Sequence, residues 1–372
     1  MSFLRCPPSV FVINNEYEIL VNANANGMIA VRIGENVYYE ENSGVLSSEK
    51  DYAKIRVPQT VLNAFKTYDV VYRATVERKA YYSKMGEIQT QSFAFKPLEK
   101  TEDIHMYHIA DVHYHFDRAA KLADYFGDDL DVLVVNGDIG EVETVENYID
   151  VCKFVGEMSK GYIPVIFVRG NHDTRGKLAE RFTDYFPANG KNTYFTFALG
   201  CLQGVVLDCG EDKVDNHLEY GAMKYFKADS PEVYGGVNAF SPFRQRELAF
   251  LKDVKLDTAD KITFAISHIC PTHTTLKKDG PFDIERACYT AWNAELERIG
   301  IQFMLTGHMH FAYILMPDDE RNTLPHNYPM VVGSAVQQDT VIGAAIVLNK
   351  NKMEVKFTDN NGNVLETHLV DI

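Results

Sequence analysis

The sequence predicts an α/β protein whose first part is a small all-β sandwich. From about residue 100 onward, apolar runs of strand length alternate with stretches in which apolar residues recur at helical spacing. This alternation is typical of a largely parallel sheet covered by helices. Before that point, short strand-like runs follow one another with few helix signals, as in a sandwich. At 372 residues, the chain is long enough for two domains.

Residues 1–98 are expected to form the sandwich. The stretches 17–24 and 28–33 are two of about seven strand-like runs, and the Asn26-Gly27 pair between them predicts a hairpin turn. The charged and polar stretch 96–103 has the composition of a linker. We therefore expect a second domain over residues 99–372.

The apolar pattern of the second domain predicts its elements. Residues 145–158 keep apolar residues at helical spacing, and another helix is expected around 284–299. The stretch 212–240 is long and irregular, which is typical of loops that cover functional sites. The late strands resemble a meander and predict a second, more mixed sheet. The strand-like runs are 104–110, 132–136, 163–168, 194–199, 202–207, 262–267, 303–306, 330–332, 343–348 and 353–357.

Bulk properties exclude several classes of protein. The formal net charge of −15 argues against an extended nucleic-acid-binding surface, which normally shows a basic patch. An anionic substrate stays compatible with this charge, because bound divalent metals can reverse the local potential. No apolar run is long enough to span a membrane, and residues 1–8 do not resemble a secretory signal. The six cysteines have no paired spacing, so we expect reduced thiols in a cytoplasmic protein without a membrane partner.

Side chains of the ligand type follow five of the predicted strands, at the point where each strand ends. In α/β sheets, the carboxyl ends of the strands are where ligands bind. The residues are Asp111 and His113 after the first strand, Asp138 after the second, Asn171, His172 and Asp173 after the third, and His268, His308 and His310 after the later ones.

Carboxylate, amide oxygen and imidazole together favour Mn, Fe or Zn over a thiolate-bound metal. The candidates exceed the four ligands of a single tetrahedral zinc, whereas two metals that share a bridging carboxylate would use them. Each residue alone has a simpler explanation, since a single histidine is usually structural and Asp138 alone would be read as a helix cap. The joint pattern therefore carries the metal-site hypothesis.

The order D-x-H, G-D, G-N-H-D, H and G-H-x-H resembles the calcineurin-like metallophosphoesterase superfamily, from residue 104 to the C-terminus. The resemblance implies a four-layer α/β/β/α fold and two divalent metal ions (Mn, Fe or Zn). It implies that the first metal is bound by Asp111, His113 and His310, the second by Asn171, His268 and His308, and that Asp138 bridges them.

The resemblance also implies a hydrolytic mechanism. A metal-bridging hydroxide would attack a small phosphate ester, His172 would contact the phosphate and protonate the leaving group, and Asp173 would orient the imidazole of His172. Further candidates for substrate binding are Arg175 and His217, together with Asn171.

A β-sandwich in front of such a domain is similar to the layout of purple acid phosphatases. Those enzymes carry an iron-binding tyrosine three residues after the G-D aspartate, where this chain has Glu141, and the first motif here offers His113 instead. The layout favours a phosphomonoesterase, and the D-x-H motif favours a phosphodiesterase. A non-catalytic scaffold of the same fold is the other hypothesis, although it predicts missing ligands and none is missing. The oligomeric state stays open.

Overall fold

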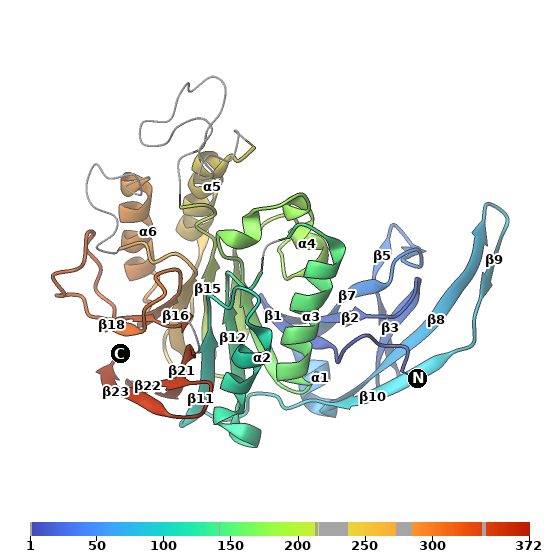
Figure 1. Cartoon of the computed structure of the whole chain (residues 1–372), viewed down its shortest axis with the longest axis horizontal. Helices are drawn as coiled ribbons and strands as arrows, with labels where there is room; N and C mark the ends of the chain where they lie inside the picture. Colours follow the sequence, from blue (N-terminus) through green and yellow to red (C-terminus); the bar gives the residue numbers. More distant parts are fainter. Residues whose placement is uncertain (1, 141, 213–214, 216–236, 273–284, 337–339) are drawn as a thin grey trace.

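The computed structural model describes residues 2–372 except 141, 213–214, 216–236, 273–284 and 337–339 (Figure 1). This described part contains a ten-stranded, a six-stranded and a five-stranded sheet and a two-stranded ribbon. None of its helices is long and apolar enough to cross a bilayer.

The ten-stranded sheet has a parallel centre and antiparallel ends. Strands β11, β12, β13 and β1 run parallel, and the C-terminal meander continues the sheet beyond β11. The meander therefore completes the first sheet. The strand order is β23 (Val364–Asp371), β22 (Lys352–Asp359), β21 (Val341–Asn349), β11 (Ile104–Ile109), β12 (Val132–Asn136), β13 (Pro164–Val168), β1 (Ser9–Ile13), β2 (Glu16–Asn22) and β7 (Tyr52–Pro58), with β20 (Ala335–Val336) on β21.

The six-stranded sheet is a second, mixed sheet, but the assignment of the late meander strands to it is wrong, because 343–348 and 353–357 lie in the ten-stranded sheet. The central strands of the six-stranded sheet are parallel, and its two edge pairs are antiparallel. The strand order is β14 (Phe195–Leu199), β15 (Leu202–Leu207), β16 (Ile262–Ser267), β17 (Phe303–Thr306), β19 (Met330–Val332) and β18 (Tyr313–Leu315).

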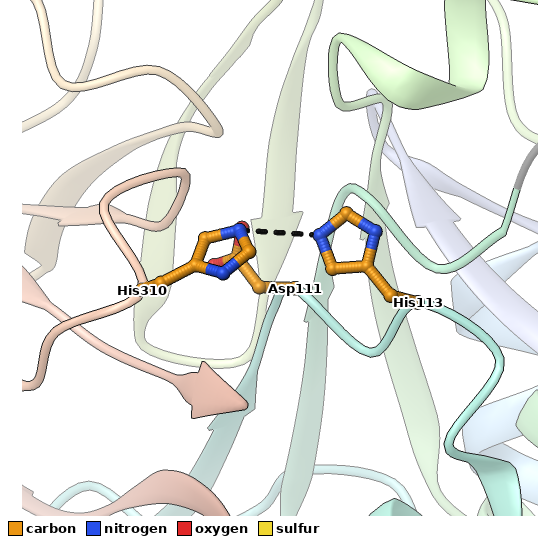
Figure 2. A group of neighbouring side chains, drawn as sticks. All are labelled: Asp111, His113 and His310. Carbon is orange, nitrogen blue, oxygen red and sulfur yellow. Dashed lines mark hydrogen bonds and ion pairs between the residues drawn. The ribbon is translucent and has the colours of Figure 1, made fainter. Parts of the chain in front are cut away.

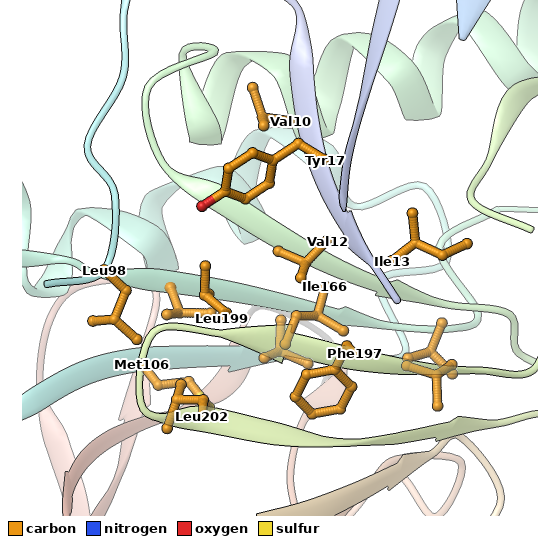
Figure 3. Packing of buried hydrophobic residues seen from close by; sticks show 14 of the residues in the cluster. Val10, Val12, Ile13, Tyr17, Leu98, Met106, Ile166, Phe197, Leu199 and Leu202 are labelled. Carbon is orange, nitrogen blue, oxygen red and sulfur yellow. The ribbon is translucent and has the colours of Figure 1, made fainter. Parts of the chain in front are cut away.

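The main hydrophobic core lies between these two sheets (Figure 3). In β12, Val132 and Val134 face this core, whereas Leu133 and Val135 face the helices on the other side. This alternation is the period of two that a strand imposes, and burial on both faces explains why the strand reads as an unbroken apolar run.

Helices cover the outer face of each sheet (Figure 1). Helix α3 (Val145–Ser159) packs on the ten-stranded sheet, and a capping box at Thr144 and Asn147 starts it. On the six-stranded sheet lie α5 (Phe240–Asp253) and α6 (Arg286–Arg298). The predicted four-layer α/β/β/α fold is confirmed. The short helices are α1 (Gln59–Phe65), α2 (Phe116–Ala119), α4 (Phe182–Tyr185), and the 3-10 turns η1 (Ala120–Tyr125), η2 (Gly127–Asp129), η3 (His172–Thr174) and η4 (Ala179–Arg181).

The N-terminal strands form a sandwich that shares one of its sheets with the rest of the protein. The five-stranded sheet packs on the β2 and β7 end of the ten-stranded sheet, in the same core. The predicted boundary between residues 98 and 99 stays a prediction. The other strands of this part are β10 (Gln89–Ala94), β8 (Thr67–Lys79), β3 (Gly27–Ile33), β4 (Asn36–Tyr39) and β9 (Tyr82–Met85), with the ribbon β5 (Glu41–Asn42) and β6 (Val45–Leu46).

The predicted hairpin at Asn26-Gly27 is wrong. Strand β2 pairs with β1 and β7, whereas β3 pairs with β4 and β8, so the chain crosses between sheets at this point. Gly27 is needed for space: a Cβ atom there would lie 2.5 Å from the carbonyl oxygen of Arg73 and against the ring of Tyr72.

Replacing Gly27 with alanine is therefore expected to lower the free energy of unfolding by about 1–3 kcal/mol, the usual cost of overpacking. The matched control is Gly86→Ala, since a Cβ at Gly86 would lie at an ordinary 3.5 Å from the Cβ of Ala74. Urea unfolding of both variants measures the effect. Equal stability of the two variants would show that the close approach at Gly27 has no energetic consequence.

Candidate metal centre

The seven predicted metal ligands lie together where strands of the two large sheets end. Loops after β11, β12 and β13 come from one sheet, and loops after β16 and β17 come from the other. The main-chain N–H of His308 donates to the Asp111 carboxylate at 2.9 Å, which joins the two sets of loops.

A first group consists of Asp111, His113 and His310, whose ligand atoms lie within 4.8 Å of one another (Figure 2). Nε2 of His113 is 3.2 Å from Nε2 of His310, and the latter is 3.5 Å from Oδ1 of Asp111. Two imidazole nitrogens and a carboxylate oxygen thus converge on one point, as in the ligand set of a divalent metal.

A second group consists of Asp138, His268 and His308, again within 4.8 Å. Nε2 of His268 is 3.2 Å from Oδ2 of Asp138. Nδ1 of His308 is 2.9 Å from Oδ1 of Asn171, which brings the predicted amide ligand to the same group.

Asp138 lies between the two groups. Its Oδ2 atom is 3.9 Å from Nε2 of His113 in the first group and 3.2 Å from Nε2 of His268 in the second. A single carboxylate oxygen therefore faces both groups, which is the arrangement of a bridging ligand.

The donor atoms fit a metal. Nδ1 of His268 lies 2.6 Å from the carbonyl oxygen of Asn136, which can only accept, so Nδ1 carries the proton of the neutral ring. Nε2 of His268 is buried, and among the described residues it has no hydrogen-bond partner. Nε2 lies 3.2 Å from Oδ2 of Asp138 and 3.7 Å from Oδ1 of Asp111, where it can bind a metal when it carries no proton, as expected of a ligand whose other nitrogen is held by the protein.

The backbone at the centre is strained. Five of the seven predicted ligands have φ between +43° and +70°, a region that costs L-residues about 1–3 kcal/mol each. These five are Asp111, His113, Asp138, His308 and His310. Gly137, before Asp138, allows close approach, since a Cβ there would lie 2.6 Å from Nδ1 of His268. Such strain is typical of functional sites.

Burial and mutual charge shift the pKa values of these groups. Burial alone would lower the pKa of His268, but the Asp138 and Asp111 carboxylates outweigh it and raise that pKa to about 10. Burial raises the pKa of Asp111 to about 7, against the opposing charge of His268, and burial lowers the pKa of His113 to about 4. Without a metal, a proton on His268 thus compensates the buried carboxylates.

His172 lies beside the centre, half-buried on η3. Its Nε2 atom is 4.0 Å from Oδ2 of Asp138, and its main-chain N–H donates to Oδ1 of Asp138 at 2.7 Å. Oδ2 of Asp173 accepts from the main-chain N–H groups of Asp138 (3.0 Å) and Gly170 (2.8 Å), so this carboxylate holds the loops after β12 and β13 together. Its predicted action on the ring of His172 stays a prediction.

Arg175 lies at the site, and its guanidinium group already has hydrogen-bond partners there. Its guanidinium donates two 2.8 Å hydrogen bonds to the carboxylate of Glu211, and its Nη1 lies 2.8 Å from Nε2 of His172. Direct binding of phosphate by Arg175 stays a prediction. His217 and Glu141 lie outside the described residues, as does most of the stretch 212–240.

Two residues at the site were missed from the sequence. Glu211 pairs with Arg175, and Oδ2 of Asp212 lies 3.4 Å from Nε2 of His308. Both lie in the loop after β15, which ends at Leu207, so the only sequence signal for them is an acidic pair shortly beyond a buried strand.

Comparisons with known proteins agree with this geometry. The family model of calcineurin-like phosphoesterases matches residues 104–312. The structure of purple acid phosphatase PPD1 from yellow lupin (Lupinus luteus) seeds is similar, with a TM-score of 0.61 and 9% sequence identity over 99% of this chain and 75% of that protein. The structure of PhoD has a TM-score of 0.53 and 10% identity over 100% of this chain and 89% of that protein.

At this identity, the two structures show a shared fold, which for both extends over the N-terminal sandwich. No curated protein matches the chain in sequence. The family model covers more than half of the chain, and the matched residues 104–312 include the groups that meet at the strand ends. The chain therefore belongs to the calcineurin-like phosphoesterase family.

Proposed function

We propose that the protein is a binuclear metal-dependent phosphoesterase that hydrolyses a small phosphate mono- or diester. The observation that carries this proposal is the position of Asp138, whose Oδ2 atom faces both groups of metal-ligand side chains. The first metal would be held by Asp111, His113 and His310, and the second by Asn171, His268 and His308. Imidazole-rich sets of this kind suit Mn, Fe or Zn.

Two divalent ions held by these residues would supply positive charge for phosphate oxygens and would lower the pKa of the attacking water. The chain itself supplies an open side through which a substrate reaches the centre, and a proton donor. The side chains of His310 and His172 are 44% and 26% exposed, whereas Asp138 and His268 are 1% exposed, so a substrate reaches the centre from the side of His310 and His172. His172 lies on that side, and in this proposal it protonates the leaving group.

Replacing His172 with alanine is expected to lower kcat by about 10²–10⁴-fold, the usual contribution of a general acid, while metal binding is retained. Asp138→Asn is expected to abolish turnover and weaken both metals, since an amide does not bridge two cations. Turnover of p-nitrophenyl phosphate and of its bis ester, with Mn, Fe, Zn or Co added separately, measures both effects and separates monoesterase from diesterase.

The control is His368→Ala, since His368 lies on β23 and pairs with Glu366 at the surface. Its activity should equal that of the wild type. Full activity of the Asp138→Asn variant, or of metal-free protein, would refute the proposal and favour the scaffold hypothesis.

Metal binding is expected to release protons and to strengthen as pH rises. The pKa of His268 is about 10 without a metal, so this ring is protonated at pH 7 and must lose its proton to become a ligand. Each proton displaced strengthens apparent affinity roughly tenfold per pH unit below that pKa. Calorimetric titration of metal-free protein between pH 6 and 8, in buffers of different ionisation enthalpy, measures the affinity and the protons released. An affinity independent of pH, with no protons released, would contradict the displacement of a proton from His268 by the metal.

A further inference from the structure

The segment from Asp208 to Asp212 follows β15 and lies against the candidate metal centre without supplying any of the seven predicted ligands. We propose that Glu211 and Asp212 are positioning residues of this centre. Asp212 holds the ring of His308 in the orientation and tautomer that leave Nδ1 free for the second metal. Glu211 holds Arg175 against His172.

The contact of Asp212 concerns the outer nitrogen of His308. Oδ2 of Asp212 lies 3.4 Å from Nε2, while Nδ1 of the same ring faces Oδ1 of Asn171 at 2.9 Å. A neutral imidazole carries one proton, and a carboxylate beside Nε2 favours the tautomer with the proton there. The lone pair of Nδ1 then lies beside Oδ1 of Asn171. These two atoms would supply two of the ligands of the second metal. Carboxylate partners of this kind orient metal-bound histidines and raise their basicity.

Glu211 contacts Arg175 on the side of the centre where His172 lies. Arg175 is held by two parallel hydrogen bonds of 2.8 Å to the Glu211 carboxylate, a geometry that fixes the plane of the guanidinium. The remaining nitrogen, Nη1, is 2.8 Å from Nε2 of His172. Oδ1 of Asp212 lies 3.9 Å from the same guanidinium. One arginine therefore connects the His172 side of the centre to the His308 side.

The segment is itself firmly held, which is what a positioning role requires. Arg244 of α5, only 1% exposed, donates to the main-chain carbonyl oxygens of Cys209 (2.8 Å) and Glu211. The main-chain N–H of Asp208 donates to Glu247 of the same helix at 2.8 Å. Arg169 donates to the Asp208 carboxylate at 2.7 Å. Helix α5 thus anchors the main chain that carries Glu211 and Asp212.

The inference rests on the proposed function, and its first test measures metal binding alone. Metal-free full-length protein is titrated with Co²⁺ while visible absorption and bound cobalt are recorded. The wild type is expected to fill two sites. In Asp212→Asn, one site is expected to weaken about 10–100-fold, as for other losses of a partner to a metal-bound histidine, while the other site keeps its affinity. Asp212→Glu is expected to restore part of the affinity.

The matched control is Asp184→Asn, which also removes one negative charge but at a half-exposed surface pair with Arg181. It should titrate like the wild type. Two sites of wild-type affinity in Asp212→Asn would overturn the role of Asp212. A wild-type protein that binds fewer than two cobalt ions would instead refute the proposed binuclear function, so the two failures are distinguishable.

The role of Glu211 is tested through His172. Glu211→Gln is expected to lower kcat about tenfold or more with unchanged cobalt affinity, because Arg175 no longer fixes the orientation of the His172 ring through Nε2. In the His172→Ala background, the same change is expected to cause no further loss, since both act through one interaction. A double variant whose kcat falls by the product of the two single losses would overturn this half of the proposal. A weakened cobalt site in Glu211→Gln would do the same.

Discussion

The buried carboxylate of Asp138 is the constraint on which the rest of the site depends. It is 1% exposed, and within 4.0 Å of its Oδ2 atom lie imidazole nitrogens from three different loops, those of His113, His172 and His268. A buried negative charge without compensation is strongly unfavourable. The cluster must therefore hold either protons, of which His268 takes one with its pKa of about 10, or metal cations. Metal binding is therefore expected to stabilise the fold.

The two large sheets supply the rigidity that this arrangement needs. Loops from one sheet bring Asp111 and Asp138, and loops from the other bring His268 and His308. Hydrogen bonds from His268 to the carbonyl of Asn136 and from the His308 N–H to Asp111 cross between them. The left-handed backbone at five of the ligands costs about 1–3 kcal/mol each, and the core between the sheets stabilises the fold against it.

The sequence indicates which side chains lie together at the strand ends because each predicted ligand follows a strand buried on both faces, such as 132–136 or 262–267. Such a strand reads as an unbroken apolar run. Features that depend on tertiary contacts cannot be predicted from the sequence alone. The sequence does not predict helix α5, because its buried face includes Arg244 and Glu247, which interrupt the helical spacing of apolar residues. The Asn26-Gly27 signal is local, whereas pairing with β8 decides where β3 lies. The Glu211 pair with Arg175 joins side chains 36 positions apart, and no local pattern encodes it.

Anomalous diffraction tests most directly whether two metals share Asp138. Crystals of the protein grown with Mn²⁺ would be measured on both sides of the manganese absorption edge. The account predicts two anomalous peaks about 3.5–4 Å apart, one beside Asp111, His113 and His310, the other beside Asn171, His268 and His308, with Asp138 between them. A single peak, or a pair of peaks that does not contact Asp138, would contradict it.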